Sequence, residues 1–429
     1  CTGNRGLLQS KVRMINMRKL SISIVTVLLL TCSLAGCFGD EEKEEKEPGF
    51  VWPEQVEKEC NISNESGLVC DFYFGVNSTP VLTLDEPNSD AIWLLDLDGM
   101  ITKWEQSDDQ VLPVQTSIVA DLTNVVSRCH FEQGLLGMDF TDDYQNTGRV
   151  LLVYNENNTC ESAKDSNVVL SHAKIVDGQL DMDSLEVLIE VKKTNRNHNG
   201  GNVLSIGNNR YVWSIGDGGG SFDPNDNGQN QSSPLGTIQL VHYENETIVP
   251  VNDTNGESYT LHYGLRNPWR IDVDPNGNLW IADVGQHCYE EVNAVPVMQS
   301  SNFGWSKREG FHDVDEEKGC YENRSEPNPE FKDPVIQYSN NESHCSIIGG
   351  SWMDWGPESL RDGYVYGDFC SGQIWVAKNI EGNWTAVEVG NVGTMIVGFG
   401  KGVNDELLIF SWAGGIYQLN EIHSSSSLE

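Results

Sequence analysis

A histidine set between asparagines and glycines stands out among the residues that could do chemistry. Residues 197–201 read NHNGG and directly precede an apolar run that begins at Val203. Paired glycines let the backbone and the His198 imidazole approach a ligand closely, and histidine can act as a base near neutral pH. A single histidine is more commonly structural or merely exposed, so its surroundings must decide its role.

A glycine-rich turn that carries Asp217 follows the next apolar run. Further along this loop, Asp223, Asn225 and Asn227 alternate before Gly228, which partly matches a calcium-binding loop. The bidentate glutamate that such a loop requires is missing, so the spacing alone leaves calcium binding open. The segment is not a phosphate loop, because it lacks Gly-Lys-Ser/Thr and no helix follows it.

Two charged residues stand at the ends of other apolar runs. Arg266, within the sequence YGLRNPW at 263–269, could bind a planar carboxylate or a quinone oxygen through two hydrogen bonds. The alternative for Arg266 is a structural arginine that bridges two parts of the fold. Glu132 precedes the run GLLG at 134–137 at the mouth of a loop, and its alternative is an ordinary surface acid.

The elements that position these residues are short strands joined by tight turns. Asp-Gly, Asn-Gly and related turns between β-rich runs are strong hairpin signals. They occur at residues 98–99, 177–178, 207–209, 276–277, 381–382 and 414–415. Helical periodicity is nearly absent. Many short hairpins over about 370 residues predict a closed, radially repeated sheet, which is an all-β, six-bladed β-propeller, with seven blades as the alternative.

The first 49 residues predict export and lipid anchoring. Met17-Arg18-Lys19 is a short basic start, an apolar run follows, and small residues end at Cys37. We interpret 1–36 as an upstream extension and lipoprotein signal peptide, and 37–49 as a lipidated Cys37 with an acidic tether. The propeller then covers 50–422, and 423–429 form a tail. The alternative is a transmembrane anchor, for which a run of about 15 apolar residues is short.

The cysteines agree with an oxidising compartment. The chain has 11 cysteines, and setting aside Cys1, Cys32 and Cys37 leaves eight, the number for four disulfides. Neighbouring positions favour Cys60–Cys70 and Cys129–Cys160, with Cys288–Cys320 and Cys345–Cys370 as the remaining pairs, although spacing does not fix the connectivity. Because no Cys-x-x-Cys pair occurs, zinc and thiol redox chemistry are not indicated.

The charge is strongly acidic. Removal of 1–36, which holds five basic residues and no acid, leaves 22 basic residues against 64 acidic ones, a net charge of −42. This field repels nucleic acid and anionic membrane surfaces, so we expect no nucleic-acid partner and membrane contact only through the lipid anchor. It favours solubility and divalent cations.

Five motifs in a fixed order resemble the soluble PQQ-dependent aldose (glucose/sorbosone) dehydrogenase family of six-bladed propellers. They are NHNGG at 197–201, GDGG at 216–219, GLRNP at 264–268, DVGQ at 283–286 with EEVN at 290–293, and NFGW at 302–305. The nearest variant is the hedgehog-interacting-protein-like branch, from LRNPW at 265–269 and YGDFCSG at 366–372. The resemblance runs from about residue 84 to residue 419.

The resemblance implies roles for seven residues. His198 matches the catalytic base that takes the proton of the sugar C1 hydroxyl while hydride passes to the quinone, and Asp217 matches the acid that supports it. The residues that match cofactor contacts are Glu132, Arg266 and Asn267. The backbone carbonyls that match the calcium ligands are those of Gly285 and Gln286.

The chain departs from the family pattern where the carboxylates of PQQ would bind. The enzymes present a late lysine and a C-terminal arginine pair there, whereas this chain has Cys370 at the lysine position and no arginine after Arg361. Lys307 or Arg308 is a possible substitute. Losing these cations should weaken the binding of a tricarboxylate.

Three functions follow as hypotheses. The first is a cell-surface aldose dehydrogenase that uses PQQ and calcium and passes electrons from a small-molecule sugar to an acceptor. The second is a non-catalytic, calcium-stabilised propeller that binds a protein or a glycan. The third is a calcium-dependent hydrolase of the lactonase type.

Overall fold

The chain divides into two compact units, Cys1–Phe50 and Val51–Glu429. This computed structural model describes residues 60–62, 67–158, 160–161, 167–250, 259–315, 319–321, 323–341 and 343–421, all within the second unit. The predicted signal peptide, Cys37, the tether and the tail lie outside the described residues. Within the described part, no helix combines the length and the apolar character that crossing a membrane requires.

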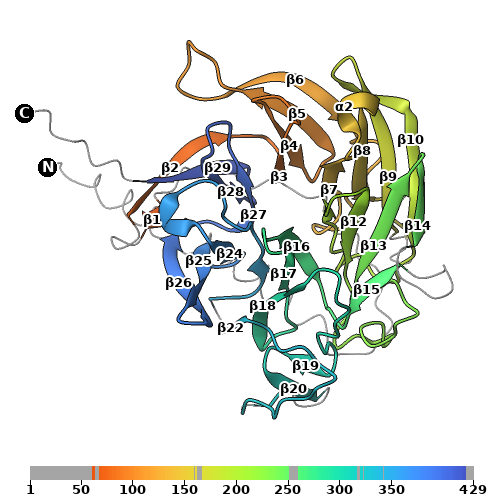
Figure 1. Ribbon diagram of the computed structural model, residues 1–429, viewed down its shortest axis with the longest axis vertical. Helices are drawn as coiled ribbons and strands as arrows, with labels where there is room; N and C mark the ends of the chain where they lie inside the picture. Colours follow the sequence, from red (N-terminus) through yellow and green to blue (C-terminus); the bar gives the residue numbers. More distant parts are fainter. Residues whose placement is uncertain are drawn as a thin grey trace, which may run out of the picture. The chain divides into compact units, whose positions relative to one another are not determined.

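The described part of the second unit is almost entirely β-structure, arranged as six sheets of four or five strands around a common centre (Figure 1). The first three sheets are formed by strands that follow one another along the chain. The first holds β3 (Pro80–Asp85), β4 (Ile92–Asp96), β5 (Met100–Glu105) and β6 (Val114–Asp121); the second holds β7 (Leu135–Phe140), β8 (Arg149–Asn155), β9 (Val168–Val176) and β10 (Gln179–Val191). The third holds β11 (Val203–Ser205), β12 (Arg210–Ile215), β13 (Thr237–Glu244), β14 (Thr247–Pro250) and β15 (Thr260–Tyr263).

The last three sheets recruit strands from further away. The fourth holds β16 (Pro268–Val273), β17 (Asn278–Asp283), β18 (Tyr289–Pro296) and β22 (Ile336–Ser339). The fifth holds β23 (Ile347–Ile348), β24 (Gly363–Asp368), β25 (Gln373–Ile380), β26 (Asn383–Asn391) and β1 (Asn61–Ile62); the sixth holds β27 (Ile396–Lys401), β28 (Leu407–Ser411), β29 (Gly415–Glu421) and β2 (Leu68–Gly75). Because β2 pairs with β29, a strand from the start of the propeller completes its last blade. The prediction of an all-β, six-bladed propeller is confirmed.

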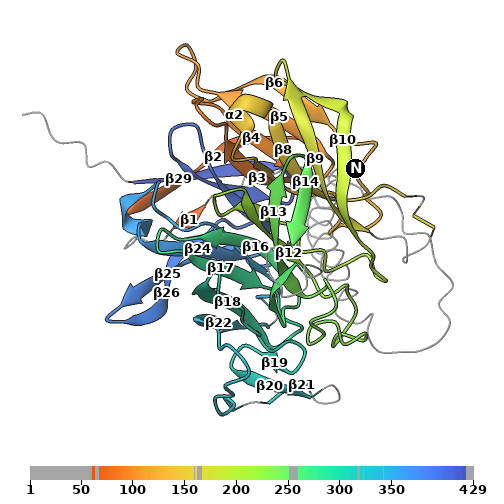
Figure 2. The ribbon, with the colours of Figure 1, turned by 45° about the vertical axis from the view of Figure 1, so that its right-hand side comes forward.

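Three elements outside the blades complete the described secondary structure. A short helix, α2 (Tyr144–Thr147), follows β7, and a 3₁₀ turn, η1 (Glu358–Leu360), precedes β24. An insertion between β18 and β22 forms a small separate sheet, which projects below the fourth blade in Figure 2. Its strands are β19 (Arg308–Glu309), β20 (His312–Asp315) and β21 (Gly319–Cys320).

The hydrophobic core lies between neighbouring blades. The second strand of each blade is buried on both faces, so β4, β8, β12 and β28 have nearly continuous apolar sequences instead of alternating ones. Trp93, Trp213 and Trp280 occupy equivalent second strands and are at most 1% exposed. The predicted turns, such as Asp98-Gly99 between β4 and β5, join the strands as expected.

All four predicted disulfides are present. Cys60 pairs with Cys70, Cys129 with Cys160, Cys288 with Cys320, and Cys345 with Cys370. Four disulfides are typical of proteins that fold in an oxidising compartment.

Candidate active site

The sequence-predicted site residues lie in loops at one face of the propeller. Strands alternate in direction within every blade, so the loop between the second and third strands and the connection to the next blade open on the same face. Glu132 and His198 lie in connections between blades, while Asp217 and Gly285 lie in second-to-third-strand loops. Hydrogen bonds join these loops directly, from Glu132 to His198, from His198 to Asp217, and from Gln286 to Phe222.

His198 and Asp217 form a buried pair. His198 Nδ1 lies 2.7 Å from Asp217 Oδ1, and their side chains are 5% and 0% exposed. The indole N–H of Trp305 donates to the second oxygen, Asp217 Oδ2, over 2.8 Å, and the backbone N–H of Gly219 donates to Oδ1 over 2.8 Å. With Nδ1 bound to a carboxylate, the tautomer that carries its proton on Nδ1 leaves Nε2 as the basic nitrogen.

The environment of Asp217 keeps this carboxyl ionised. Burial alone would raise its pKa, but the charge of His198, the hydrogen bond from His198, the charge of Arg266 and the Gly219 N–H together lower the pKa below its usual value. An ionised Asp217 stabilises a positive charge on the imidazole. The pair is therefore suited to take a proton from a ligand and hold it.

The turn that carries His198 is held from two sides. The backbone N–H of His198 donates to Glu132 Oε2 over 2.7 Å. The ammonium of Lys193 donates to the backbone oxygen of Asn197 over 2.7 Å and also to the side-chain oxygen of Asn199. His198 itself adopts a φ of +54°, a conformation that is uncommon for residues other than glycine. These contacts compensate for a strained backbone at the candidate base.

The paired glycines serve chain packing at this turn. Gly201 has a φ of +119°, and a Cβ added there would lie 2.4 Å from the Cβ of Leu136 in β7. Glycine therefore lets the His198 turn pack directly against the second blade. We expected these glycines to allow a close approach to a ligand, and the close approach in the structure is to a neighbouring strand.

Arg266 and Asn267 reach the same face from the start of β16. Their backbone N–H groups both donate to Asp283, and Asn267 Oδ1 accepts the N–H of Gly200 over 3.0 Å. Arg266 Nη1 donates to the backbone oxygen of Val284 over 3.1 Å, and its guanidinium lies 5.6 Å from the Trp305 ring. Its buried Nε has no hydrogen-bond partner among the residues that the structure describes. Both residues are buried, with Arg266 8% exposed and Asn267 7% exposed. Arg266 can therefore have both a structural role and a ligand-binding role, because part of its guanidinium has no partner among the described residues.

Gly285 and Gln286 fit the predicted role of calcium ligands. Neither backbone oxygen accepts a hydrogen bond from any residue that the structure describes. The Gln286 side chain is held by the backbone N–H of Phe222 over 3.0 Å, which ties this loop to the loop of Asp217. Two consecutive unpaired carbonyl oxygens are hard oxygen donors of the kind that calcium prefers.

A cavity of about 10 Å³ lies beside Gly285, lined in part by Arg266, Asp283, Glu291 and Glu309. This volume is about that of one water molecule and holds no organic cofactor. Burial raises the pKa of both Asp283 and Glu291, with a further rise from the charge of Asp217 for Asp283 and from the charge of Asp283 for Glu291. The base of the candidate calcium loop is therefore a buried acidic region.

The second candidate for a calcium loop is used internally. Asp223 accepts the backbone N–H groups of Asn227 and Gly228, and Asn227 Nδ2 donates to the backbone oxygen of Asp217 over 2.8 Å. Asn225 Nδ2 donates to Thr194. Because the oxygens of Asp223 close its own loop, these side chains shape the loop that carries Asp217.

The structure corrects one proposed substitute for the missing cations. Arg308 is 4% exposed and is bound by Asp313, Asp333 and the backbone oxygen of Glu326, so it is committed to the fold of the insertion. Lys307 is exposed. Arg308 therefore cannot replace the family's late lysine or arginine pair.

Aromatic rings and a disulfide occupy the loop that carries Cys370 and the neighbouring loop at 412–414. Cys370 is paired with Cys345, and the neighbouring Phe369 packs edge-to-face against Trp412 at 5.8 Å between ring centroids. Phe131, which is 39% exposed, meets Trp412 in the same way at 6.1 Å. The loop residues 369–372 and 412–414 contain no lysine or arginine. These two loops therefore offer no counter-charge to the carboxylates of PQQ.

Sequence reasoning missed four residues that shape the site. Trp305 was recognised as part of a motif but received no role, although its indole holds Asp217. Asp283, Lys193 and Glu309 were not singled out, and they act on backbone groups through tertiary contacts. A signal did exist for Asp283, because it begins the motif DVGQ.

Comparison with known proteins identifies the family of this chain. The family model for glucose/sorbosone dehydrogenase matches residues 92–354. The chain belongs to the glucose/sorbosone dehydrogenase family. Among curated proteins, the HIPL1 protein of Arabidopsis thaliana is 30% identical over 216 residues, covering 43% of this chain and 30% of that protein. The HIPL2 protein of the same plant is 31% identical over 209 residues, covering 42% and 29%. The match therefore spans less than a third of either relative.

Solved structures of the same fold include members of this family. The soluble aldose sugar dehydrogenase of Escherichia coli in its apo form superposes with a TM-score of 0.65 at 14% identity, covering 83% of this chain and 100% of that one. The PQQ-bound aldose sugar dehydrogenase of Streptomyces coelicolor superposes with a TM-score of 0.59 at 17% identity, covering 82% and 98%. At these identities the likeness supports the fold alone.

Proposed function

We propose that this chain is an aldose dehydrogenase that oxidises a sugar at its C1 hydroxyl. The buried His198–Asp217 pair carries the proposal, since a 2.7 Å contact with an ionised carboxylate makes the imidazole a base. Membership of the glucose/sorbosone dehydrogenase family supports the same reaction class.

The residues of this chain divide the work of the reaction. His198 Nε2 takes the proton of the C1 hydroxyl as hydride leaves C1, which turns the sugar into a lactone. Asp217 stabilises the resulting imidazolium, and Trp305 keeps the carboxylate oriented. Glu132 and Lys193 hold the turn that carries the imidazole.

The remaining predicted site residues would hold calcium and PQQ. The unpaired backbone oxygens of Gly285 and Gln286 would bind calcium, while Arg266 and Asn267 would contact PQQ. When bound, PQQ supplies the hydride acceptor and calcium polarises it. A further acceptor would then take up the electrons.

The location of the reaction is part of the proposal. Cys37 would carry the lipid, and the acidic tether at 37–49 would separate the propeller from the membrane surface. The four disulfides support folding outside the cytoplasm.

The proposal is tested by reconstituting the purified protein with PQQ and calcium and following dye reduction with a panel of aldoses. We expect reduction that requires both additions and that falls about 100-fold or more in His198→Ala. The matched control is His172→Gln, which alters a buried histidine of β9 that bonds Tyr243 away from this face. Lactone hydrolysis without PQQ would instead indicate a hydrolase.

A second function is favoured by one observation. The loops at 369–372 and 412–414 carry aromatic rings and a disulfide and contain no cation, which suits a protein or glycan ligand better than a tricarboxylate. If the purified protein does not bind PQQ and does not reduce dye with any aldose, that result would support this non-catalytic function.

A further inference from the structure

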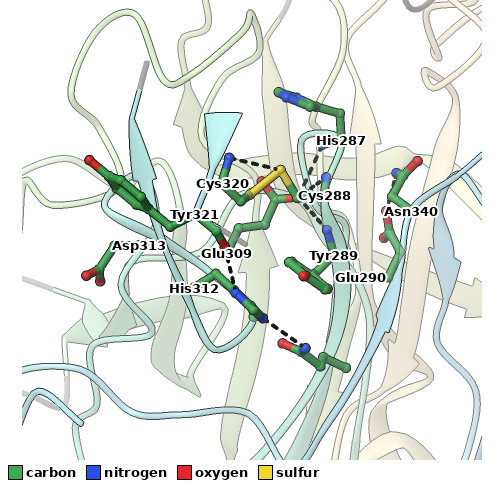
Figure 3. The surroundings of a disulfide bond; sticks show 12 residues. His287, Cys288, Tyr289, Glu290, Glu309, His312, Asp313, Cys320, Tyr321 and Asn340 are labelled. Carbon is green, nitrogen blue, oxygen red and sulfur yellow. Dashed lines mark hydrogen bonds between the residues drawn. A yellow bond between two sulfur atoms is a disulfide. The ribbon is translucent and has the colours of Figure 1, made fainter. Parts of the chain in front are cut away.

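The loop that carries Gly285 and Gln286 is wrapped around one buried carboxylate from the insertion. Glu309 Oε1 accepts three consecutive backbone N–H groups, those of His287, Cys288 and Tyr289, over 3.2, 2.8 and 2.9 Å. Figure 3 shows these dashed contacts converging on the Glu309 carboxylate. Glu309 is 3% exposed, so water does not compete for this oxygen.

The loop packs so tightly that only glycine, which has no Cβ, fits at position 285. A Cβ added to Gly285 would lie 1.9 Å from the backbone oxygen of Tyr289 and 2.7 Å from Glu309 Oε1. The backbone N–H of Gly285 is held from the opposite side by Glu290 Oε2 over 3.1 Å. The course of the loop is therefore set by two carboxylates, one at each end.

The Cys288–Cys320 disulfide joins the same loop to the insertion covalently. Cys320 ends β21, and its backbone N–H donates to Cys288 Sγ over 3.2 Å. Tyr289 stacks on His312 of β20 with ring centroids 4.0 Å apart, which adds a third attachment (Figure 3). None of these contacts uses the backbone oxygens of Gly285 and Gln286.

We propose that Glu309 is a positioning residue that presets the backbone oxygens of Gly285 and Gln286 for calcium, with the Cys288–Cys320 disulfide keeping the insertion in place. Carboxylates that accept backbone N–H groups form strong, charge-assisted hydrogen bonds, so Glu309 orders this loop before any ion arrives. The inference rests on the proposed function, because the proposed function assigns calcium to these oxygens. It adds a role for the β19–β21 insertion.

The test is calcium titration by calorimetry, combined with hydrogen exchange of residues 284–292. In Glu309→Ala we expect calcium to bind about 10-fold to 100-fold more weakly, as is typical for partners behind metal ligands. The amides of His287, Cys288 and Tyr289 should also exchange faster. Glu309→Gln, which keeps an acceptor oxygen without the charge, should recover part of both properties. The double variant Cys288→Ser/Cys320→Ser should shift both readouts in the direction of Glu309→Ala.

Two matched controls separate positioning from charge and from general stability. Glu406→Gln removes a buried carboxylate that lies between β27 and β28 and bonds Tyr73 and Asn404, so calcium affinity should change by less than about threefold. Cys345→Ser/Cys370→Ser removes a disulfide of the same face that does not touch the loop. Unchanged calcium affinity and exchange in Glu309→Ala would overturn the inference alone. A wild-type protein without calcium binding would overturn the proposed calcium site, and this inference with it.

Discussion

At the scale of single residues, the site depends on buried charges that act on the backbone. Lys193 is 2% exposed, and its ammonium holds the oxygens on either side of His198. Its neighbours Glu132 and Asp217 favour the charged form, but burial outweighs them and lowers the pKa of Lys193 to about 7. The candidate base is thus attached to a group that titrates near neutral pH.

Lys193 should make the stability of the protein depend on pH in a defined window. The unfolded chain keeps this proton up to the ordinary lysine pKa of 10.5, whereas the folded chain loses it near 7. Because the unfolded state binds more protons between these values, the free energy of unfolding gains about 1.4 kcal/mol per pH unit from this group as pH rises. Urea unfolding of wild type and Lys193→Met between pH 7 and pH 10 measures this. The free energy of unfolding of the wild type should rise with pH relative to that of Lys193→Met. Parallel pH curves for the two proteins would contradict it.

At the scale of elements, local signals predicted most of the fold. The turn dipeptides specify hairpins through the backbone conformations they allow, and the order of the hairpins specifies a ring. The His198–Asp217 pair was expected from the resemblance of NHNGG and GDGG to the dehydrogenase family, not from the local pattern alone. Glu309 was not, because it comes from an insertion whose short strands carry no repeat, and its partners are backbone N–H groups that leave no mark in the sequence. The role of Arg308 was predicted wrongly for the same reason. Its partner Asp313 lies in that insertion, and its partner Asp333 lies in the segment that leads from the insertion to β22.

Arg270 of β16 joins inner strands across the centre of the ring. Its Nη1 donates to the backbone oxygen of Leu136 in β7 over 3.0 Å, and its Nη2 donates to that of Val81 in β3 over 3.2 Å. Burial lowers the pKa of Arg270 to about 9, so the guanidinium remains charged at neutral pH. One side chain thereby connects the fourth blade to the first and second.

Replacing Arg270 should destabilise the propeller. Arg270→Met removes a donor from each of two buried carbonyl oxygens, and we expect the free energy of unfolding to fall by about 2 to 5 kcal/mol. The control Arg210→Met alters a part-exposed arginine of β12 whose side chain, among the described residues, bonds Gly207 of its own turn, and it should change stability by less than about 0.5 kcal/mol. Equal stability of the two variants in denaturant titrations would refute the bridging role.

At the scale of the whole molecule, charge opposes the binding of an anionic cofactor. The chain has a formal net charge of −37, and two of the loops facing the site carry no cation. The long-range field therefore repels a tricarboxylate, and salt screens that repulsion.

The affinity for PQQ should consequently rise with ionic strength. At saturating calcium, we expect PQQ to bind about 2-fold to 10-fold more tightly in 0.5 M than in 0.05 M sodium chloride, where the screening length falls from more than 10 Å to less than 5 Å. Fluorescence titration of PQQ at the two salt concentrations measures this. Tighter binding at low salt would show that cations not recognised in the site hold the carboxylates.

The most direct test of the account is a single-turnover experiment on the protein loaded with PQQ and calcium. Under anaerobic conditions, adding an aldose should reduce the bound PQQ, seen as a change in its absorbance, and His198→Gln should slow this step by about 100-fold to 10,000-fold without releasing PQQ. Wild-type protein that holds PQQ and calcium but is reduced by no aldose would contradict the assignment of sugar oxidation to the His198–Asp217 pair.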